Sequence, residues 1–269
     1  MTTLRRAYVD VAGRQVHYRC AGSEGLPRLL LLHQSPSSSA MYSQLMLELA
    51  DRYQLFAPDT PGFGGSDPLP EVGEARQVAD YAAVIHGFCT ALSLSPCAVF
   101  GHHTGAAIAV QLEHDYPGTA RAMVLSGPTL LTAEQKASLP ELASPFPPAE
   151  DGAHLLAMWR RIRDKDPEAP LALSQREVHS AFACGASYLA SYEAVTQQDF
   201  TGQLAGIECP VLVFAGDQDP LYNAVAPTLA RLPNGASVDL PGGERTYVCE
   251  RQTDIVAAVL DKFFSRSGS

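Results

Sequence analysis

The sequence predicts an α/β fold in which a mostly parallel sheet is flanked by helices and interrupted by a helical insertion. Short apolar segments recur along the chain, such as 29–32, 97–100, 122–125 and 210–214. Their lack of polar residues is typical of strands covered on both faces. Helical segments separate them, which favours a doubly wound parallel sheet. The alternation stops between residues 129 and 201, where only helical patterns and proline-rich joints occur.

The first forty residues predict a hairpin followed by a buried strand. Segments 8–11 and 15–18 alternate in polarity around the turn Ala12-Gly13-Arg14. The apolar run Leu29–Leu32 then predicts a central strand. Helical spacing of Met41, Leu45 and Leu49 follows, and residues 53–57 predict the next strand.

Turn signals divide the rest of the chain. Residues 59–67 form a dense turn cluster, and the remaining predicted elements are helix 78–92, strand 97–100, helix 104–116 before Pro117-Gly118, strand 122–125, strand 210–214, strand 237–240 and helix 253–264. We therefore assign residues 1–128 and 202–269 to the core and residues 129–201 to an inserted lid.

Composition excludes several classes of protein. Of 269 residues, 19 are Lys or Arg and 29 are Asp or Glu, which gives a formal net charge of −10. Without a basic run, nucleic-acid binding has little support. The six cysteines are scattered, residues 1–8 lack a signal peptide's apolar core, and no apolar run reaches the ~20 residues of a membrane span. We expect a cytoplasmic protein without a membrane partner; a homodimer stays open.

Five motifs, in order, resemble those of the α/β-hydrolase superfamily. They are the loop at residues 33–36, the turn at 59–66, Gly101-His102-His103-Thr104-Gly105, the helical stretch, and the acid loop at 216–220. The resemblance covers essentially the whole chain. It implies an eight-stranded, mostly parallel α/β-hydrolase sheet, with the helical stretch as its lid. The glycines beside His103 fit a strained turn that lifts the central side chain into a pocket.

The chain departs from the superfamily at two catalytic positions. His103 occupies the position of the nucleophile, which is usually a serine. The usual position of the catalytic histidine falls on Glu244, and no histidine follows His179. A Ser-Asp-His triad in the usual chain order is therefore excluded.

The resemblance places His103, Glu244 and Asp219 in one pocket. We expect a His103–Glu244 dyad that moves protons, with Asp219 holding Glu244 in place. Covalent attack by His103 is a weaker alternative, because Glu244 would then have to direct water. His102 is expected to pack beneath the turn.

The anion-binding part of the site is expected to survive. The backbone N–H groups of Thr104 and Gln34 would stabilise an oxyanion. His33, Trp159 and Tyr188 are further candidates for the pocket; Tyr188 could equally pack the lid, as could Tyr192. The serines at 35 and 37–39 read as helix caps. No metal ligand spacing and no phosphate-binding glycine motif occur, so neither metal nor cofactor is expected.

Two functions follow as hypotheses. The first is an enzyme that acts on a small apolar carbonyl compound, such as an ester, lactone or ketone. It would work by hydrolysis through directed water, or by lyase-type elimination or C–C cleavage. The second is a ligand-binding protein without catalysis. The two replacements are ionisable and complementary, and this favours the enzyme.

Overall fold

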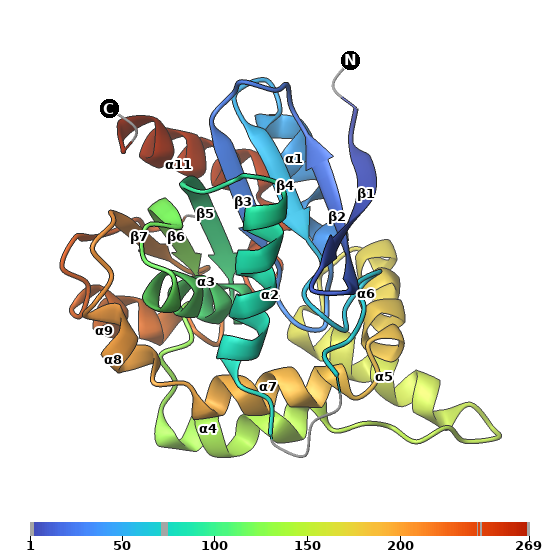
Figure 1. Cartoon of the computed structure of the whole chain (residues 1–269). Coiled ribbons are helices and arrows are strands. Elements are labelled where there is room, and N and C mark those ends of the chain that lie inside the picture. Colours follow the sequence, from blue (N-terminus) through green and yellow to red (C-terminus); the bar gives the residue numbers. More distant parts are fainter. Residues whose placement is uncertain (1–2, 71–74, 241, 243, 268–269) are drawn as a thin grey trace.

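The computed structural model describes residues 3–70, 75–240, 242 and 244–267. Within this part of the chain an eight-stranded sheet has the order β1-β2-β4-β3-β5-β6-β7-β8 (Figure 1). Its strands are β1 (Arg5–Val11), β2 (Arg14–Ala21), β3 (Arg28–Leu32), β4 (Gln54–Pro58), β5 (Cys97–His102), β6 (Ala120–Ser126), β7 (Val211–Phe214) and β8 (Gly235–Ser237). Strand β2 runs antiparallel to β1 and β4, and the other pairs are parallel. The predicted fold class is confirmed.

Helices lie on both faces of this sheet and at one end of it (Figure 1). They are η1 (Ser39–Tyr42), α1 (Ser43–Leu49), α2 (Val78–Ala91), α3 (Thr104–Asp115), α4 (Ala133–Ser138), η2 (Leu139–Ala143), α5 (Ala153–Lys165), α6 (Leu171–Ala183), α7 (Ser187–Gln197), α8 (Phe200–Leu204), η3 (Tyr222–Ala224), α9 (Val225–Leu229), α10 (Val248–Arg251) and α11 (Thr253–Arg266).

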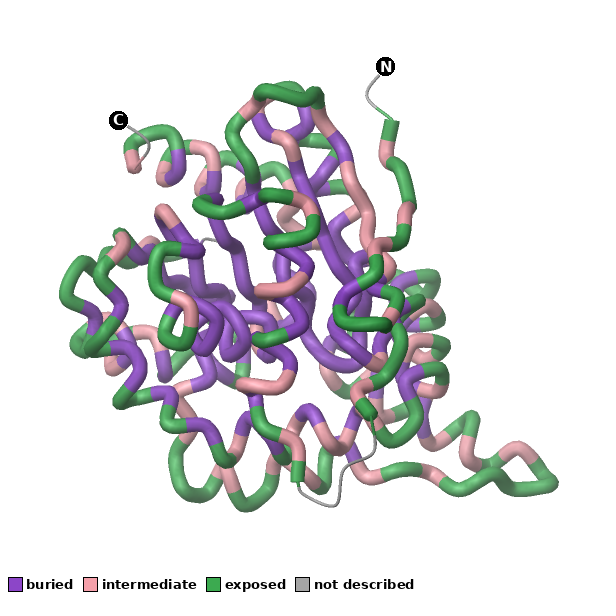
Figure 2. The backbone as a smooth tube through the Cα atoms, in the orientation of Figure 1, coloured by how far each residue is buried: buried purple, intermediate pink, exposed green. Residues whose placement is uncertain are grey.

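Successive residues of the central strand β3 enter different cores. Leu29 and Leu31 pack with α1 and α11, whereas Leu30 and Leu32 pack with α2 and α3 on the opposite face. All four are fully buried, and the strands form the buried centre of the molecule in Figure 2. Burying one leucine contributes about 1.5–3 kcal/mol. This burial on both faces explains the uninterrupted apolar run and gives the site a rigid base.

The segment between β6 and β7 is helical, as expected. Its helices α4 to α7 lie at the end of the sheet in Figure 1, and α5, α6 and α7 share an apolar cluster. Met158, Ile162 and Tyr188 pack there against Phe63, which belongs to the turn after β4. The division into core and lid stays a prediction, but this cluster joins the insertion to the core.

The last strand is displaced from its predicted position. Strand β8 covers residues 235–237 rather than 237–240, with Gly235 opposite Val211 and Ser237 opposite Val213. Its three residues are exposed, so burial does not mark the strand in the sequence. Leu240 is buried in the core after the strand has ended. The alternating polarity of residues 237–240 therefore comes from a loop whose last residue, Leu240, packs into the core.

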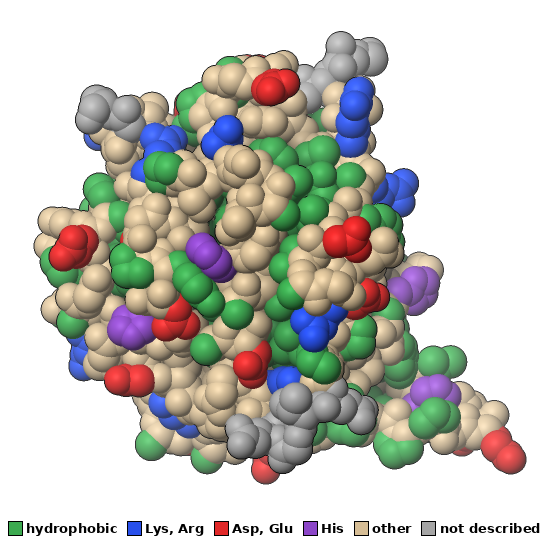
Figure 3. Space-filling view, viewed as in Figure 1, with side chains coloured by type: hydrophobic (Ala, Val, Ile, Leu, Met, Phe, Trp, Pro, Cys, Tyr) green, Lys and Arg blue, Asp and Glu red, His purple; other side chains and the backbone are tan. Residues whose placement is uncertain are grey.

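The surface and the cysteines agree with an ordinary globular composition. On the face seen in Figure 3, charged side chains of both signs are scattered as separate spots. All six cysteines are free thiols. No helix in the described residues combines the length and apolarity required to cross a membrane.

Candidate functional site

His103 lies at a strained turn between β5 and α3. Its backbone angles are φ 51° and ψ −114°, which residues other than glycine rarely adopt. A Cβ atom on Gly101 would lie 2.4 Å from the carbonyl oxygen of Gly105, and one on Gly105 would lie 2.0 Å from that of Leu32. Both glycines are thus required by close backbone approach, and together they hold the histidine on the turn.

The ring of His103 reaches across the end of β6 to the acid loop after β7. Its Nε2 atom lies 2.7 Å from Oδ2 of Asp219. The ring passes over Gly127, where a Cβ atom would lie 2.4 Å from Cδ2 of His103. Gly127 also has a positive φ of 60°. The consecutive parallel strands β5, β6 and β7 therefore supply the ring, the space for it and its carboxylate partner.

The surroundings of Asp219 keep its carboxyl group ionised. Burial raises its pKa, but His103, His102 and the N–H of Leu221 favour the charged form, and the net pKa lies below the ordinary value. The Leu221 N–H donates to Oδ1 at 2.8 Å. An ionised carboxylate only accepts hydrogen bonds, so the neutral ring must carry its proton on Nε2. This leaves Nδ1 of His103 as the basic nitrogen.

His102 supports the turn from beneath. It is fully buried, with Nε2 donating to the Thr246 carbonyl at 2.8 Å and Nδ1 2.9 Å from the Ser126 hydroxyl. Burial and the neighbouring His103 lower the pKa of His102 to about 3. A neutral ring with one donor and one acceptor satisfies both contacts, in agreement with the packing role expected for it.

The prediction of a hydrogen bond between His103 and Glu244 is wrong. Oε2 of Glu244 instead accepts a hydrogen bond from Nε of Arg251 at 2.7 Å, and the partner of His103 is the carboxylate of Asp219. The backbone of Glu244 does lie beside the acid loop, because its carbonyl accepts from the N–H of Gln218 at 3.1 Å. Its side chain, however, points to α10. Asp219 consequently holds the histidine and not a second carboxylate.

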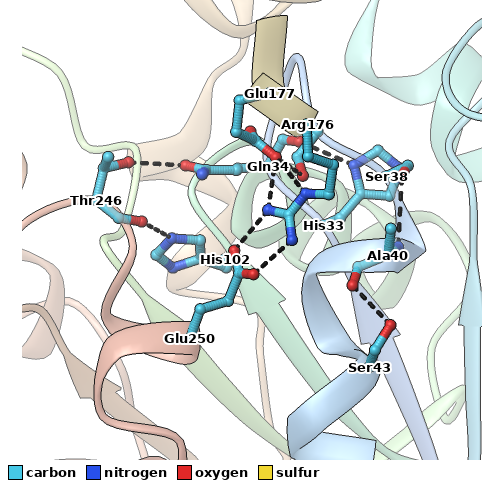
Figure 4. Close-up of polar contacts among 11 residues, drawn as sticks. His33, Gln34, Ser38, Ala40, Ser43, His102, Arg176, Glu177, Thr246 and Glu250 are labelled. Carbon is cyan, nitrogen blue, oxygen red and sulfur yellow. Dashed lines mark hydrogen bonds and ion pairs between the residues drawn. The ribbon is translucent and has the colours of Figure 1, made fainter. Parts of the chain in front are cut away.

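The loop after β3 is fastened to the turn. The N–H of Ser35 donates to Oγ1 of Thr104 at 2.7 Å, and the Thr246 hydroxyl donates to Oε1 of Gln34 at 2.8 Å. Thr246 thereby bridges Gln34 and His102 through its hydroxyl and its carbonyl (Figure 4). Thr104 is the first residue of α3, where backbone N–H groups lack acceptors within the helix.

His33, a candidate for the pocket, packs within the loop after β3 and is not among the lining residues of the cavity. It is 1% exposed, its Nδ1 donates to the Gln34 carbonyl at 2.8 Å, and its Nε2 accepts from the Thr60 N–H at 2.8 Å. Burial lowers its pKa, although Asp59 opposes the shift. Both nitrogens are therefore committed to holding the loop. Ser38 caps η1 through Ala40, as expected for this serine-rich stretch.

A cavity of about 210 Å³ lies over the turn, lined by both the core and the insertion. Of the expected residues, it is lined by His103, Thr104 and Gln34; Asp219 lies behind the His103 ring. Trp159 and Tyr188 are not among its lining residues in the described chain. Trp159 is only partly buried on α5, and Tyr188 packs inside the insertion.

Two polar lining residues that bear on the chemistry were missed by the sequence reasoning, and a third had been left undecided. The missed residues are Thr129 after β6 and Lys165 at the end of α5, and the undecided one is Tyr192 on α7. Tyr192 donates to the Ser35 carbonyl at 3.3 Å. A helix-terminal lysine normally indicates a solvated cation, so the sequence carries no signal for Lys165. The position of Thr129 after a central strand was the one usable sign.

Ion pairs fix the insertion to the chain after β8. The guanidinium of Arg176 on α6 donates to both oxygens of Glu250 at 2.5 and 2.7 Å, and to Oε1 of Glu177 at 2.7 Å (Figure 4). Arg251 joins Glu244 to Asp166 in the same way. Among the described residues, no group of three or more His, Cys, Asp or Glu side chains could hold a metal ion.

Comparisons with known proteins agree with this geometry. The sequence profile of the family described as alpha/beta hydrolase fold matches residues 27–246. A 2-(acetamidomethylene)succinate hydrolase of Mesorhizobium japonicum is 27% identical over 268 residues, which cover 95% of this chain and 93% of the relative.

Solved structures share the fold at low identity. An esterase from Thermogutta terrifontis superposes with a TM-score of 0.80 and 19% identity, covering 98% of this chain and all of the esterase chain. An enol-lactonase from Burkholderia xenovorans gives a TM-score of 0.79 and 17% identity, with 96% of this chain and all of that chain covered. At such identities the likeness shows the fold alone.

Proposed function

Because this chain belongs to the alpha/beta hydrolase fold family, we propose that it is an enzyme that hydrolyses a small carbonyl compound with a His103–Asp219 pair. The observation that carries the proposal is the 2.7 Å hydrogen bond between His103 Nε2 and Asp219 Oδ2 on the strained turn. Here the histidine stands where the family's serine is usual, and it already has the carboxylate partner that orients a catalytic histidine.

The proposed reaction uses Nδ1 of His103 as a general base. Nδ1 removes a proton from a water molecule as the water oxygen attacks the substrate carbonyl, and Asp219 stabilises the imidazolium that forms. The carbonyl oxygen becomes an oxyanion, and we expect the N–H groups of Thr104 and Gln34, two lining residues of the cavity, to bind it. Transfer of the same proton to the leaving group then breaks the carbonyl–oxygen or carbonyl–nitrogen bond and restores the neutral ring.

Attack by His103 itself is less well supported than attack by water. An acyl-imidazole would need a second base to direct water, and Glu244 was the candidate for that role. Its carboxylate is paired with Arg251, away from the ring. Elimination or C–C cleavage would use the same base and donors, but the names of the relatives favour hydrolysis. The M. japonicum relative, aligned over nearly the whole chain, is named a hydrolase of an acetamido compound.

The test is hydrolysis of a panel of small esters, amides and lactones, followed by proton release at constant pH. We expect His103→Ala to reduce kcat at least 100-fold, since a positioned general base contributes about 10²–10⁴. Asp219→Asn removes the acceptor that fixes the tautomer and should reduce kcat by a similar factor. Glu244→Gln separates the two possible pairings, because it leaves the His103–Asp219 bond intact and should retain most of the activity.

Three results would overturn the proposal. If turnover is unchanged in His103→Ala, His103 is not the general base. Loss of kcat in Glu244→Gln with retention in Asp219→Asn would restore the pairing expected from sequence. Ligand binding without turnover of any panel member would favour the ligand-binding protein.

A further inference from the structure

The cavity above His103 contains one cation from the insertion. Lys165 ends α5, and its side chain lines the cavity. The Nζ atom lies 3.3 Å from the hydroxyl of Tyr188 and 5.7 Å from the centroid of that ring. None of the ion pairs among the described residues includes Lys165. The Lys165 ammonium is therefore partly buried beside the hydroxyl and ring of Tyr188, and no carboxylate among the described residues forms an ion pair with it.

The ammonium keeps its charge in this setting. Burial lowers the pKa of Lys165, but the surrounding tyrosines, Tyr188 and Tyr192 above all, outweigh burial and the pKa lies above the ordinary value. A charged group removed from water without a counter-charge is costly. An anion that entered the cavity would remove this cost.

Another polar group of the cavity wall, the hydroxyl of Thr129, lacks a hydrogen-bond partner among the described residues. Thr129 is 5% exposed and lines the cavity, and its Oγ1 atom has no hydrogen-bond partner in the part of the chain that the structure describes. Buried hydroxyl groups are almost always hydrogen-bonded, so the Thr129 hydroxyl is available to a polar atom of a molecule that enters the cavity. Much of the remaining wall is apolar, including Leu131, Leu139 and Leu221.

We infer that Lys165 binds a carboxylate carried by the substrate, so that the substrates are small carbonyl compounds with an acid group. The inference rests on the proposed function for the reacting carbonyl, whereas the binding of the carboxylate requires no turnover. The cavity volume of about 210 Å³ lies below the range of about 300–1,000 Å³ of drug-sized pockets, which restricts the substrate to a compact molecule. The apolar substrate expected from the sequence is thereby revised.

Two esters with the same carbon skeleton test the inference. Monomethyl succinate carries a carboxylate, and dimethyl succinate does not. Binding of each is measured by titration calorimetry to the wild type and to His103→Ala, in which the ester is not expected to be consumed. Lys165→Met and Lys165→Arg are measured in both backgrounds. Lys136→Met is the matched control, because Lys136 belongs to α4 of the same insertion and is not a lining residue.

We expect monomethyl succinate to bind at least tenfold more tightly than the dimethyl ester, since a hydrogen bond to a charged group contributes about 1.5–3 kcal/mol. Lys165→Met should abolish this preference, Lys165→Arg should retain part of it, and Lys136→Met should leave it unchanged. Equal binding of both esters to the wild type overturns the inference even if a Lys165 variant fails to fold. A preference that survives Lys165→Met overturns it as well.

These outcomes are independent of the proposed reaction. If the carboxylate preference depends on Lys165 but no ester is turned over, the proposed function fails and the inference stands. If esters are hydrolysed through His103 without regard to a carboxylate, the function stands and the inference fails.

Discussion

Arg176→Met tests whether the insertion is held to the core by the ion pairs of α6 and α10. The substitution removes a guanidinium that contacts Glu177 and Glu250, whose side chains are 1% and 15% exposed. Removing one partner of a buried ion pair costs about 3–5 kcal/mol, because the other charge stays buried and unpaired. Arg176 itself is 29% exposed, so we expect a loss of about 2–4 kcal/mol at pH 7.

The loss converts into a measurable shift of the melting temperature. An unfolding entropy of about 2.1 cal/mol/K per residue gives about 0.56 kcal/mol/K for 269 residues. A loss of 3 kcal/mol therefore lowers Tm by about 5 °C. Circular dichroism melts measure this shift, with Arg160→Met as the control, since Arg160 is exposed on the neighbouring helix α5.

The pH dependence of the loss has a defined sign. Burial raises the pKa of Glu250 and Arg176 opposes the rise, so the variant should raise it further. The unpaired charge is then present at pH 7 and disappears as pH falls through this raised pKa, and the Tm difference should shrink at pH 5. Adding Glu250→Gln to Arg176→Met should recover part of the stability at pH 7. A Tm within 1 °C of the wild type, or an equal loss at both pH values, would refute the reasoning.

Three further substitutions test the elements that position the site. Gly105→Ala places a Cβ atom 2.0 Å from the Leu32 carbonyl oxygen, so we expect little soluble protein; a wild-type yield and urea midpoint would contradict this. Burial and the adjacent imidazole lower the pKa of His102 to about 3. Below pH 6.5 the wild type should therefore lose about 1.4 kcal/mol per pH unit more than His102→Gln, as urea unfolding at pH 6.5 and 4.5 can determine. Burial opposes ionisation of Asp59, but hydrogen bonds lower its pKa to about 2. Asp59→Asn should cost about 2–3 kcal/mol at pH 7 and progressively less as pH falls from 4 to 2, and a pH-independent cost would be inconsistent with this.

The turn that carries His103 could be predicted because close backbone approach leaves a mark in the sequence. Gly101 and Gly105 occupy positions where any side chain would overlap the backbone of a neighbouring element. The acid loop was also predictable, since the carboxyl ends of parallel strands meet at one edge of a sheet. Burial on both faces likewise marked the central strands.

The choice between two carboxylates could not be made from the sequence. Asp219 contacts His103 on the turn, and the backbone of Glu244 lies beside the loop that carries Asp219, joined to it by the hydrogen bond from Gln218 to the Glu244 carbonyl. Which side chain reaches the ring depends on its direction, and Arg251 draws Glu244 away. Lys165 was missed for a related reason: its helix is amphipathic and ends in basic residues, a pattern shared by solvated helices.

The turn after β5 supplies the histidine and the loop after β7 supplies its carboxylate. The chain after β8 therefore contributes no side chain to this pair and has a structural role instead. Glu244 is not needed for proton transfer, and the ion pairs of Glu250 with Arg176 and of Arg251 with Glu244 and Asp166 hold the insertion. We expect substitutions in these ion pairs to alter how firmly the insertion is held while leaving the His103–Asp219 hydrogen bond intact. The residues that attach the insertion and the residues proposed to move the proton are therefore two separate sets in this fold.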